Sequence, residues 1–401
     1  MDTQNSKANK TIKPRFSGEM VQLGTLGKTQ SGGTPSSKHP EYFSGCIPWI
    51  GTTALNGGLL DERNAVKMIT EEAVAKSATK IVPAGSIMVG IRVGVGKVAI
   101  NTIPMCTSQD IVSIIGIDER KWNKEYISLA LQHKAPILAA QARGATISGI
   151  TSKSLKAIAI PALALVRQEE IVSQIRNIEQ QIADVKNEFA QLNSLVKSRF
   201  IEMFEVYARE GNTAALSELC EFVTVGIANA ATHAYANDGI VMLRNLNVRE
   251  NHLDDSDLIK INPNFAAKYS KKTLKAGDVL VTRTGYPGIA CVVPEKYAGC
   301  QTFTTLIARL KSNAQIIPLF LSFWINSPAG KEFVERMKAG SSQQNFGATS
   351  LKLLEVPLPP LELQQEFASF VSQVDKLRFK TQQQIEKLEM LKASLMQEYF
   401  E

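Results

Sequence analysis

The chain has 401 residues, of which 44% are apolar and 21% charged, and this composition is typical of a globular protein with one to three domains. Its five cysteines form no CxxC pair and no run of eighteen apolar residues occurs, which argues against a disulfide framework, a zinc cluster and a membrane span. The formal net charge of +7 is compatible with a polyanionic partner, and the cysteine usage favours a reducing cytoplasm.

The first part of the chain predicts an arm followed by a compact mixed α/β domain. Residues 1–14 are polar with scattered lysines and have no apolar core behind them, so we expect a mobile arm and not a secretory signal. Across residues 15–160, short β-rich runs such as "SIMVGI" and "IVSIIGI" alternate with glycine-rich turns, and the helical stretch "KEYISLALQH" follows these runs.

Two later segments each predict one long helix. Residues 161–208 have almost no glycine or proline and place apolar side chains in alternating steps of four and three. Residues 209–356 return to β-rich runs such as "DVLVTR" and "TLIARL", and residues 357–401 repeat the helical pattern. We expect the two helices to pack on each other, antiparallel, and to hold two globular domains apart. The alternative is two surface helices, each packed on its own domain.

The predicted interface between the two helices follows this heptad register. In the second helix, Arg378, Thr381 and Lys392 interrupt the apolar stripe, and Leu377 and Leu391 offer an alternative course for it one residue away. The residues predicted to form the interface are Ile171, Ile175, Ile178, Ile182, Phe189, Phe367, Val371, Val374, Ile385 and Leu388. Apolar residues off this stripe are expected to leave an exposed surface for partner proteins; they are Leu195, Phe200, Ile201, Phe204, Phe370, Phe379, Met390 and Phe400.

The two halves of the chain also repeat each other at a nearly constant offset. Pro161, Gln168 and Glu170 recur 196 residues later as Pro357, Gln364 and Glu366. The stretches "KIVPAGSIMVGIRVGVGKVAI" (80–100) and "KTLKAGDVLVTRTGYPGIACV" (272–292) align at an offset of 192 residues. A period of roughly 190 residues is too long for a solenoid repeat. It therefore predicts a duplicated domain in a molecule with pseudo-twofold symmetry.

Several motifs occur in the order that is typical of one family. The second junction reads "PLPPLELQ" (357–364), and the first, "PALALVRQ" (161–168), keeps its first proline and its glutamine. "SGGTPSSKHPEYFSGCIPWI" (31–50) and "AGDVLVTRTGYPG" (276–288) complete the set, although the opening of the second domain departs from the pattern. This order of motifs, present twice, resembles the specificity subunit of type I restriction-modification systems.

The resemblance implies a mixed α+β fold, in which two target-recognition domains (15–160 and 209–356) are joined by two helices forming a coiled-coil spacer (161–208 and 357–401). Each domain would read one half of a split, asymmetric site in double-stranded DNA. Two methyltransferase subunits, using S-adenosylmethionine, would dock on the chain, and restriction subunits, using ATP and Mg, would join them. The chain itself would be cytoplasmic and non-catalytic, with no cofactor of its own.

Candidate DNA-binding residues are polar side chains in predicted loops, which can reach phosphates or base edges. Among them, Arg143 and Arg283 are the strongest, because each lies near a glycine and a guanidinium can fork onto guanine. In the first domain the candidates are Thr34, Lys38, Arg92, Lys97, Gln141 and Arg143. In the second they are Arg244, Asn245, Arg283, Thr284, Tyr286, Gln343, Gln344 and Asn345.

Two other functions remain as alternatives, namely a fused DNA adenine methyltransferase and a coiled-coil scaffold. "GIRVGVGK" (90–97) has the wrong glycine spacing for a phosphate loop and predicts a turn between strands. "NPNF" (262–265) resembles a methyltransferase tetrad but has Asn264 where a proline is needed, so it also predicts a turn. The four histidines have no metal-ligand spacing. Binding of S-adenosylmethionine would favour the methyltransferase, and absence of DNA binding at modest salt would favour the scaffold.

Overall fold

The computed structural model describes residues 18–143, 149–209, 212–228, 232–339 and 346–401. The chain divides into two compact units, of which the first comprises Met1–Lys186 with Gln383–Glu401 and the second comprises Asn187–Gln382. Each unit therefore contains one globular domain and a section of both long helices. None of the helices in the described ranges is both long enough and apolar enough to cross a bilayer.

The described part of the first unit contains two sheets and a separate strand pair. One sheet has the order β2-β10-β7-β8-β4, with bounds Lys28–Ser31, Ile111–Ile115, Ile87–Gly90, Val98–Asn101 and Leu59–Leu60. The other has the order β5-β3-β9-β6, with bounds Lys67–Ile69, Ile47–Ile50, Met105–Thr107 and Ile81–Val82. The pair joins Met20–Gln22 (β1) to Ala159–Pro161 (β11). The short helices α1 (Glu71–Ala75) and α3 (Ser152–Lys156) lie between strands.

The five-stranded sheet is covered on both faces at its centre, which explains why its central strands are rich in apolar residues. On one face, Ile87 and Val89 pack with side chains of α2 (Lys124–Arg143). On the other face, Met88 packs with Ile50 and other residues of the second sheet. The central strands are consequently buried along their whole length.

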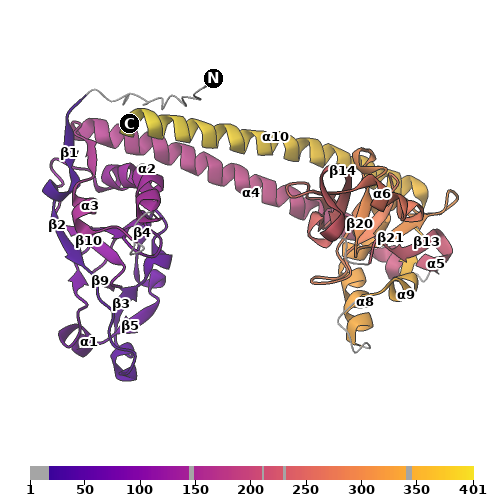
Figure 1. Cartoon of the computed structure of the whole chain (residues 1–401), viewed down its shortest axis with the longest axis horizontal. Helices are drawn as coiled ribbons and strands as arrows, with labels where there is room; N and C mark the ends of the chain where they lie inside the picture. Colours follow the sequence, from indigo (N-terminus) through magenta and orange to yellow (C-terminus); the bar gives the residue numbers. More distant parts are fainter. Residues whose placement is uncertain (1–17, 144–148, 210–211, 229–231, 340–345) are drawn as a thin grey trace, which may run out of the picture. The chain divides into compact units, whose positions relative to one another are not determined.

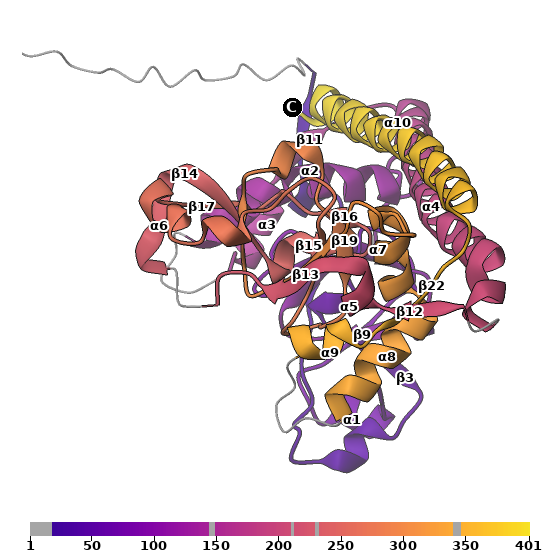
Figure 2. The same cartoon turned by 90° about the vertical axis from the view of Figure 1, so that its right-hand side faces the viewer.

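The second unit repeats this plan. Its four-stranded sheet has the order β13-β21-β18-β19, with bounds Cys220–Val225, Leu306–Leu310, Val279–Val281 and Ala290–Val292. A second sheet has the order β17-β14-β20, with bounds Ile259–Ile261, Tyr235–Arg244 and Gln301–Phe303. Val248–Arg249 (β15) pairs with His252–Leu253 (β16), and Thr213–Ala215 (β12) pairs with Glu355–Pro357 (β22) (Figure 2). Its helices besides the two long ones are α5 (Leu216–Leu219), α6 (Pro263–Ala267), α7 (Pro318–Asn326), α8 (Pro328–Ala339) and α9 (Ala348–Lys352).

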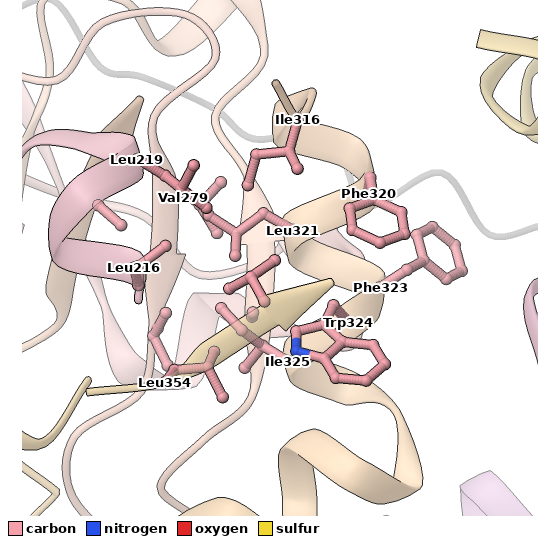
Figure 3. Close-up of a cluster of buried hydrophobic side chains, with 14 of the residues drawn as sticks. Leu216, Leu219, Val279, Ile316, Phe320, Leu321, Phe323, Trp324, Ile325 and Leu354 are labelled. Atoms are coloured by element: carbon pink, nitrogen blue, oxygen red, sulfur yellow. The ribbon is translucent and has the colours of Figure 1, made fainter. Parts of the chain in front are cut away.

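Helix α7 fills the core of the second unit. Its residues Leu321 and Ile325 point toward Val279 of the central strand and the leucines of α5, whereas Phe320 and Phe323 point to the opposite side of the helix (Figure 3). This matches the place of α2 in the first unit, and the paired strands are also in the same register. Ile87 is paired with Ile114 in the first unit, just as Val279 is paired with Ala308 in the second. The predicted duplication of a mixed α+β domain is thus confirmed.

The long helices α4 (Leu165–Arg209) and α10 (Leu361–Phe400) pack against each other in antiparallel directions (Figure 1). In the first unit, the Lys186 ammonium lies 2.8 Å from Glu389, and the Glu179 carboxylate lies 2.5 Å from Lys392. Further toward the start of α4, Gln174 accepts a hydrogen bond of 2.6 Å from Tyr399. As the residue numbers fall along α4, those of its partners rise along α10, which defines the antiparallel direction.

Most residues of the predicted helix–helix interface are buried. The buried ones are Ile171, Ile175, Ile178, Phe367, Val371, Val374 and Ile385, and the partly buried ones are Ile182, Phe189 and Leu388. The alternative course of the stripe is wrong, because Leu377 and Leu391 are each 48% exposed while Thr381 is buried. The predicted heptad register is retained because the short side chain of Thr381 fits into the interface between the two helices. Arg378 and Lys392 reach carboxylates with their charged ends, namely those of Asp375 and Glu179.

Three aromatic side chains that were expected to remain on the surface are instead buried. Phe200 and Phe204 of α4 contact Phe320 of α7, with ring centroids 5.7 and 4.9 Å apart. Phe400 of α10 lies 5.2 Å from the ring of Tyr126 in α2. The last turns of both long helices therefore belong to domain cores. Leu195, Ile201, Phe379 and Met390 are exposed, and Phe370 is partly buried.

Replacing Phe367 tests how strongly the second unit depends on its long helix. Phe367 is fully buried among Phe200, Phe204 and Phe323. We expect Phe367→Ala to lower the free energy of unfolding of this unit by about 3–5 kcal/mol, because it leaves a cavity. Phe379→Ala in the same helix is the matched control, since Phe379 is 65% exposed. Hydrogen exchange of peptides from residues 212–382 measures both, and equal effects would contradict the prediction.

Both proline junctions have the same hydrogen bonds. Gln168 is fully buried; its Oε1 accepts from the backbone N–H of Asn123 at 2.9 Å, and its Nε2 donates to the carbonyls of Lys121 and Leu163 at 2.9 and 2.8 Å. This glutamine joins the start of α4 to the start of α2, so it fixes where the long helix leaves the domain.

Gln364 makes the equivalent bonds in the second unit. Its Oε1 accepts from Ile317 at 2.9 Å, and its Nε2 donates to the carbonyls of Gln315 and Pro359 at 2.9 and 2.8 Å. Gln364 is also fully buried, and it joins the start of α10 to the start of α7. The proline and glutamine that recur at the same spacing in the sequence therefore mark a buried set of three hydrogen bonds, made by Gln168 in the first unit and by Gln364 in the second. We call each set a glutamine clamp.

Candidate nucleic-acid interface

In the first unit, four segments meet at one edge of the five-stranded sheet. Strands β2 and β7 end at this edge and the antiparallel strand β10 begins there. The N–H of Gly32 donates to the carbonyl of Ile111 at 3.0 Å, and the N–H of Ile91 donates to the carbonyl of Asp110 at 2.8 Å. The N–H of Ile150 donates to the carbonyl of Ile91 at 2.7 Å. These bonds gather the loop after β2, the turn after β7, the loop before β10 and the segment after α2.

The corresponding segments meet in the second unit. The N–H of Gly226 donates to the carbonyl of Thr305 at 2.9 Å, which joins the loop after β13 to the loop before β21. The N–H of Phe346 donates to the carbonyl of Arg283 at 3.2 Å. This last bond is the counterpart of the one between Ile150 and Ile91. The same edge of the same sheet is thus assembled twice from the same four segments.

The turn at this edge is pressed against a helix in both units. Residues 90–97 join β7 to β8 as the predicted turn, and residues 282–289 join β18 to β19. Gly96 and Gly288 both have positive φ, at 83° and 89°. A Cβ on either residue would come within 2.7 Å of a helix residue, namely Ala135 or Val334. Glycine is therefore needed at both positions for conformation as well as for space.

Four of the six candidates of the first domain lie at this edge with exposed side chains. Thr34 and Lys38 follow β2, and Arg92 and Lys97 lie on the turn. The Arg92 guanidinium is 3.8 Å from the carboxylate of Asp110, so its charge is only loosely engaged.

The other two first-domain candidates differ from the predicted loop positions. Helix α2 continues through Gln141 and ends at Arg143, whereas the sequence predicted that both residues lie in a loop. Gln141 is exposed on this helix, and the side chain of Arg143 lies outside the described part of the structure. The helix extends because the segment from Ala135 onward contains good helix formers that outweigh the internal Pro136.

In the second domain, hydrogen bonds bring three candidates together. Asn245 donates to the hydroxyl of Thr284 at 2.6 Å and accepts from the N–H of Arg283 at 3.5 Å. Tyr286 is 84% exposed at the tip of the turn. Gln343, Gln344 and Asn345 lie outside the described residues, although Phe346, which follows them, is bonded to Arg283.

Arg244 is held within the domain instead of projecting from a loop. It is the last residue of β14, and its guanidinium is bonded to the carboxylate and the carbonyl of Asp257 at 2.8 and 2.9 Å. Its side chain is only 21% exposed. The sequence "LRNLN" suggested a solvated loop, but a strand ends at the arginine and a 3₁₀ helix covers Asn245–Asn247.

Residues that sequence reasoning missed lie in the same positions of the repeat. Strand β3 pairs in parallel with β9 as β14 pairs with β20, and a 3₁₀ helix follows each, at Thr52–Ala54 and Asn245–Asn247. Thr53 of the first unit is exposed there, at the position that corresponds to Asn245 of the second. Extending the offset of 192 residues from Asn245 leads to Thr53 and would have identified this segment.

The loop before β21 is strained. Gly33 and Gly32 bond to Thr107 and Ile111 in the first unit, whereas Ile227 and Gly226 bond to Thr302 and Thr305 in the second. The second loop is therefore one residue shorter. Thr304 in this loop has φ 59°, which is an unfavourable conformation for a β-branched residue. Strained residues of this kind gather at functional sites.

The methyltransferase-like motif at residues 262–265 has a structural role. Asn262 caps α6 by accepting the N–H of Asn264 at 2.8 Å, so "NPNF" begins a short helix instead of forming an isolated turn. The described residues contain no group of three or more His, Cys, Asp or Glu side chains that could hold a metal ion.

A family model described as the type I restriction modification DNA specificity domain matches residues 18–194 and again residues 209–390. The chain belongs to the type I restriction-modification specificity family. The double match of this family coincides with the two copies of the fold and with the two sheet edges described above. The motifs that the sequence analysis identified thus belong to a specificity protein, as predicted.

Individual members of the specificity family show the same relationship. The chain is 33% identical over 159 residues to a type I restriction enzyme specificity subunit from Escherichia coli, covering 38% of this chain and 39% of that protein. It is 23% identical over 291 residues to the EcoBI specificity subunit of Escherichia coli, covering 65% of this chain and 60% of that protein. The matches thus span between about two fifths and three fifths of these relatives.

A solved structure shares the fold across nearly the whole chain. Its title describes complex assembly and conformational transition of the type I restriction-modification system. The TM-score is 0.61 at 15% identity, covering 95% of this chain and 97% of that chain. At this identity the likeness concerns the fold alone.

Proposed function

We propose that the chain is the DNA-recognition subunit of a type I restriction-modification complex and that each unit reads one half of a bipartite, asymmetric site. The observation that carries this proposal is the repeated sheet edge, where the same four segments meet in both units but present different side chains. The first edge presents Thr34, Lys38, Arg92 and Lys97, and the second presents Asn245, Arg283, Thr284 and Tyr286. Two sheet edges with the same backbone arrangement but different side chains suit a DNA site whose two halves differ in sequence.

The side chains at the two edges suit two kinds of DNA contact, namely contacts to phosphates and contacts to base edges. Lys38, Arg92 and Lys97 can neutralise phosphates, a contact that positions the protein without reading sequence. The amide of Asn245 has the donor and the acceptor that suit an adenine edge, and the guanidinium of Arg283 has the paired donors that suit a guanine edge. Asn245 is held by Thr284 at 2.6 Å, so its amide is already oriented before DNA arrives.

We further propose that α4 and α10 set the number of unread base pairs between the half-sites and carry the docking surface for two methyltransferase subunits. Exposed apolar side chains on these helices, among them Phe379 and Met390, support a protein interface. The related structure whose title describes assembly of a type I system supports the same role. S-adenosylmethionine would then belong to the methyltransferase subunits, and ATP and Mg to a restriction subunit.

Exchanging one domain tests independent reading. In cells that express this chain with its methyltransferase partner, methylome sequencing should report two half-sites separated by a fixed gap. We expect that replacing residues 15–150 with the matching segment of a relative will change one half-site and leave the other, as well as the gap, as before. A change in both halves would show that the domains do not read independently. Methylation without any bipartite motif would overturn the proposed function.

A further inference from the structure

The tips of the two edge turns carry unusually exposed apolar side chains. Val93 is 64% exposed in the first unit, and Tyr286 is 84% exposed in the second. Tyr286 has the highest exposure of the large hydrophobic side chains in the described ranges. Exposing this much apolar surface has a free-energy cost that binding to a partner would recover. Both tips present such a side chain although the two turns differ in sequence.

The backbone beneath Tyr286 is braced by one buried hydroxyl. The Oγ1 of Thr282 donates to the carbonyl of Tyr286 at 2.6 Å and accepts from the N–H of Ile289 at 2.9 Å. Thr282 is itself only 3% exposed. The first unit has Gly90 at this position, so its turn is held by backbone bonds, such as that from Gly96 to Gly90 at 3.0 Å. The side-chain brace is thus particular to the turn that carries the tyrosine.

Neighbouring elements hold the same turn from two further sides. Gly288 is in close contact with Val334 of α8, and Thr284 accepts the hydrogen bond from Asn245. Tyr286 therefore projects from a turn whose backbone is fixed before DNA binds. A side chain with only two rotatable bonds on a fixed backbone loses little conformational freedom on binding.

We propose that Tyr286 contacts the DNA through its ring, packing against the exposed edge of a base in the half-site read by the second unit, and that Thr282 positions it. The inference rests on the proposed function and specifies how one of its contacts is made. An apolar ring is the chemistry that the tip offers, and in a duplex such a side chain can pack against base edges, for example the methyl group of thymine. Val93 presents a smaller apolar group at the equivalent tip, where it suits contact with a thymine methyl.

The test uses the full chain assembled with its methyltransferase subunits and a duplex that contains the methylated site. Fluorescence anisotropy gives the affinity, and methylome sequencing gives the recognised bases. We expect Tyr286→Ala to weaken binding roughly ten- to hundredfold, which is the range for losing the burial of one large apolar side chain. Tyr286→Phe should stay within about twofold of the parent, since it keeps the ring. Tyr235→Ala, at another exposed tyrosine of the same unit, should have no effect.

Variants of Thr282 separate positioning from direct contact. Thr282→Val removes the hydroxyl at nearly constant volume and should weaken binding, whereas Thr282→Ser keeps the hydroxyl and should restore it. The inference is overturned if Tyr286→Ala binds within twofold of the parent, or if Tyr286→Phe is as weak as Tyr286→Ala, which would assign the contact to the hydroxyl. These results leave a bipartite methylation pattern intact, so they are distinguishable from failure of the proposed function.

Discussion

Replacing the buried glutamine of a junction should detach a long helix from its domain. We expect Gln364→Leu to lower the free energy of unfolding of the second unit by roughly 3–6 kcal/mol, since three backbone groups lose their partner; each loss costs about 1–3 kcal/mol for a buried group and less for the two that are only partly buried. These groups are the N–H of Ile317 and the carbonyls of Gln315 and Pro359. Leucine has a similar volume but can satisfy none of them.

The repeat supplies the controls for this experiment. Gln168→Leu should weaken the first unit by a similar amount, because Gln168 makes the same three hydrogen bonds there. Gln365→Leu replaces an exposed neighbour of Gln364 and should leave stability almost unchanged. Hydrogen exchange followed by mass spectrometry reports the two units separately. If the backbone amides of α7 and of the start of α10 exchange as slowly in Gln364→Leu as in the parent, the buried glutamine does not hold α10 to its domain.

The effect on recognition should follow the unit that is changed. If each unit reads its own half-site, Gln364→Leu should reduce discrimination in the half-site of the second unit before that of the first. Gln168→Leu should do the opposite. Methylome sequencing at a temperature at which the variants remain folded measures this difference, and an equal loss in both half-sites would argue against separate reading.

The architecture is predictable from the sequence because it is periodic. The offsets of 196 and 192 residues identified the duplication, and the apolar steps of four and three identified the helix pair. The buried strands at residues 87–90 and 279–281 followed from continuous apolar runs. These signals depend only on the order of residues along the chain, so they can be recognised without knowing which surfaces pack together.

The errors arose where tertiary contacts decide burial. Phe200 and Phe204 lie off the heptad stripe, and nothing in the helix itself reveals that Phe320 of α7 covers them. Thr381 is buried while Leu377 is exposed, because the partner helix determines which side is covered. Arg244 looked available for DNA until a strand placed it beside Asp257. For the first two the deciding residues lie in another helix, and for Arg244 the deciding residue lies 13 positions further along the chain.

The grouping of the candidate site was equally beyond the sequence. Loops after β2 and β7 and before β10 are separated by tens of residues, and only the strand order brings them to one edge. The tether from Phe346 to Arg283, repeated from Ile150 to Ile91, has no motif of its own. Once the sheet order is known, however, the repeat predicts the members of one edge from those of the other.

Shortening both long helices should move the two half-sites closer together. We expect that deleting one seven-residue repeat from α4, and the matched repeat from α10, will reduce the gap between half-sites by about three base pairs. Seven helical residues span roughly 10.5 Å at 1.5 Å per residue. Ten base pairs span about 34 Å along B-DNA. The half-sites themselves should not change, because the deletion leaves both sheet edges intact.

The matched repeats can be chosen from the contacts between the helices. Lys186 lies 2.8 Å from Glu389, so removing seven residues beside each of them deletes facing turns of the antiparallel pair. A whole heptad preserves the apolar stripe, whereas a deletion of five residues would rotate it off the partner helix. The control exchanges the charges in Lys186→Glu with Glu389→Lys, which keeps both helix lengths and should keep the gap. Methylome sequencing reads the gap directly, and an unchanged gap in a folded, active deletion variant would show that the helices do not set it.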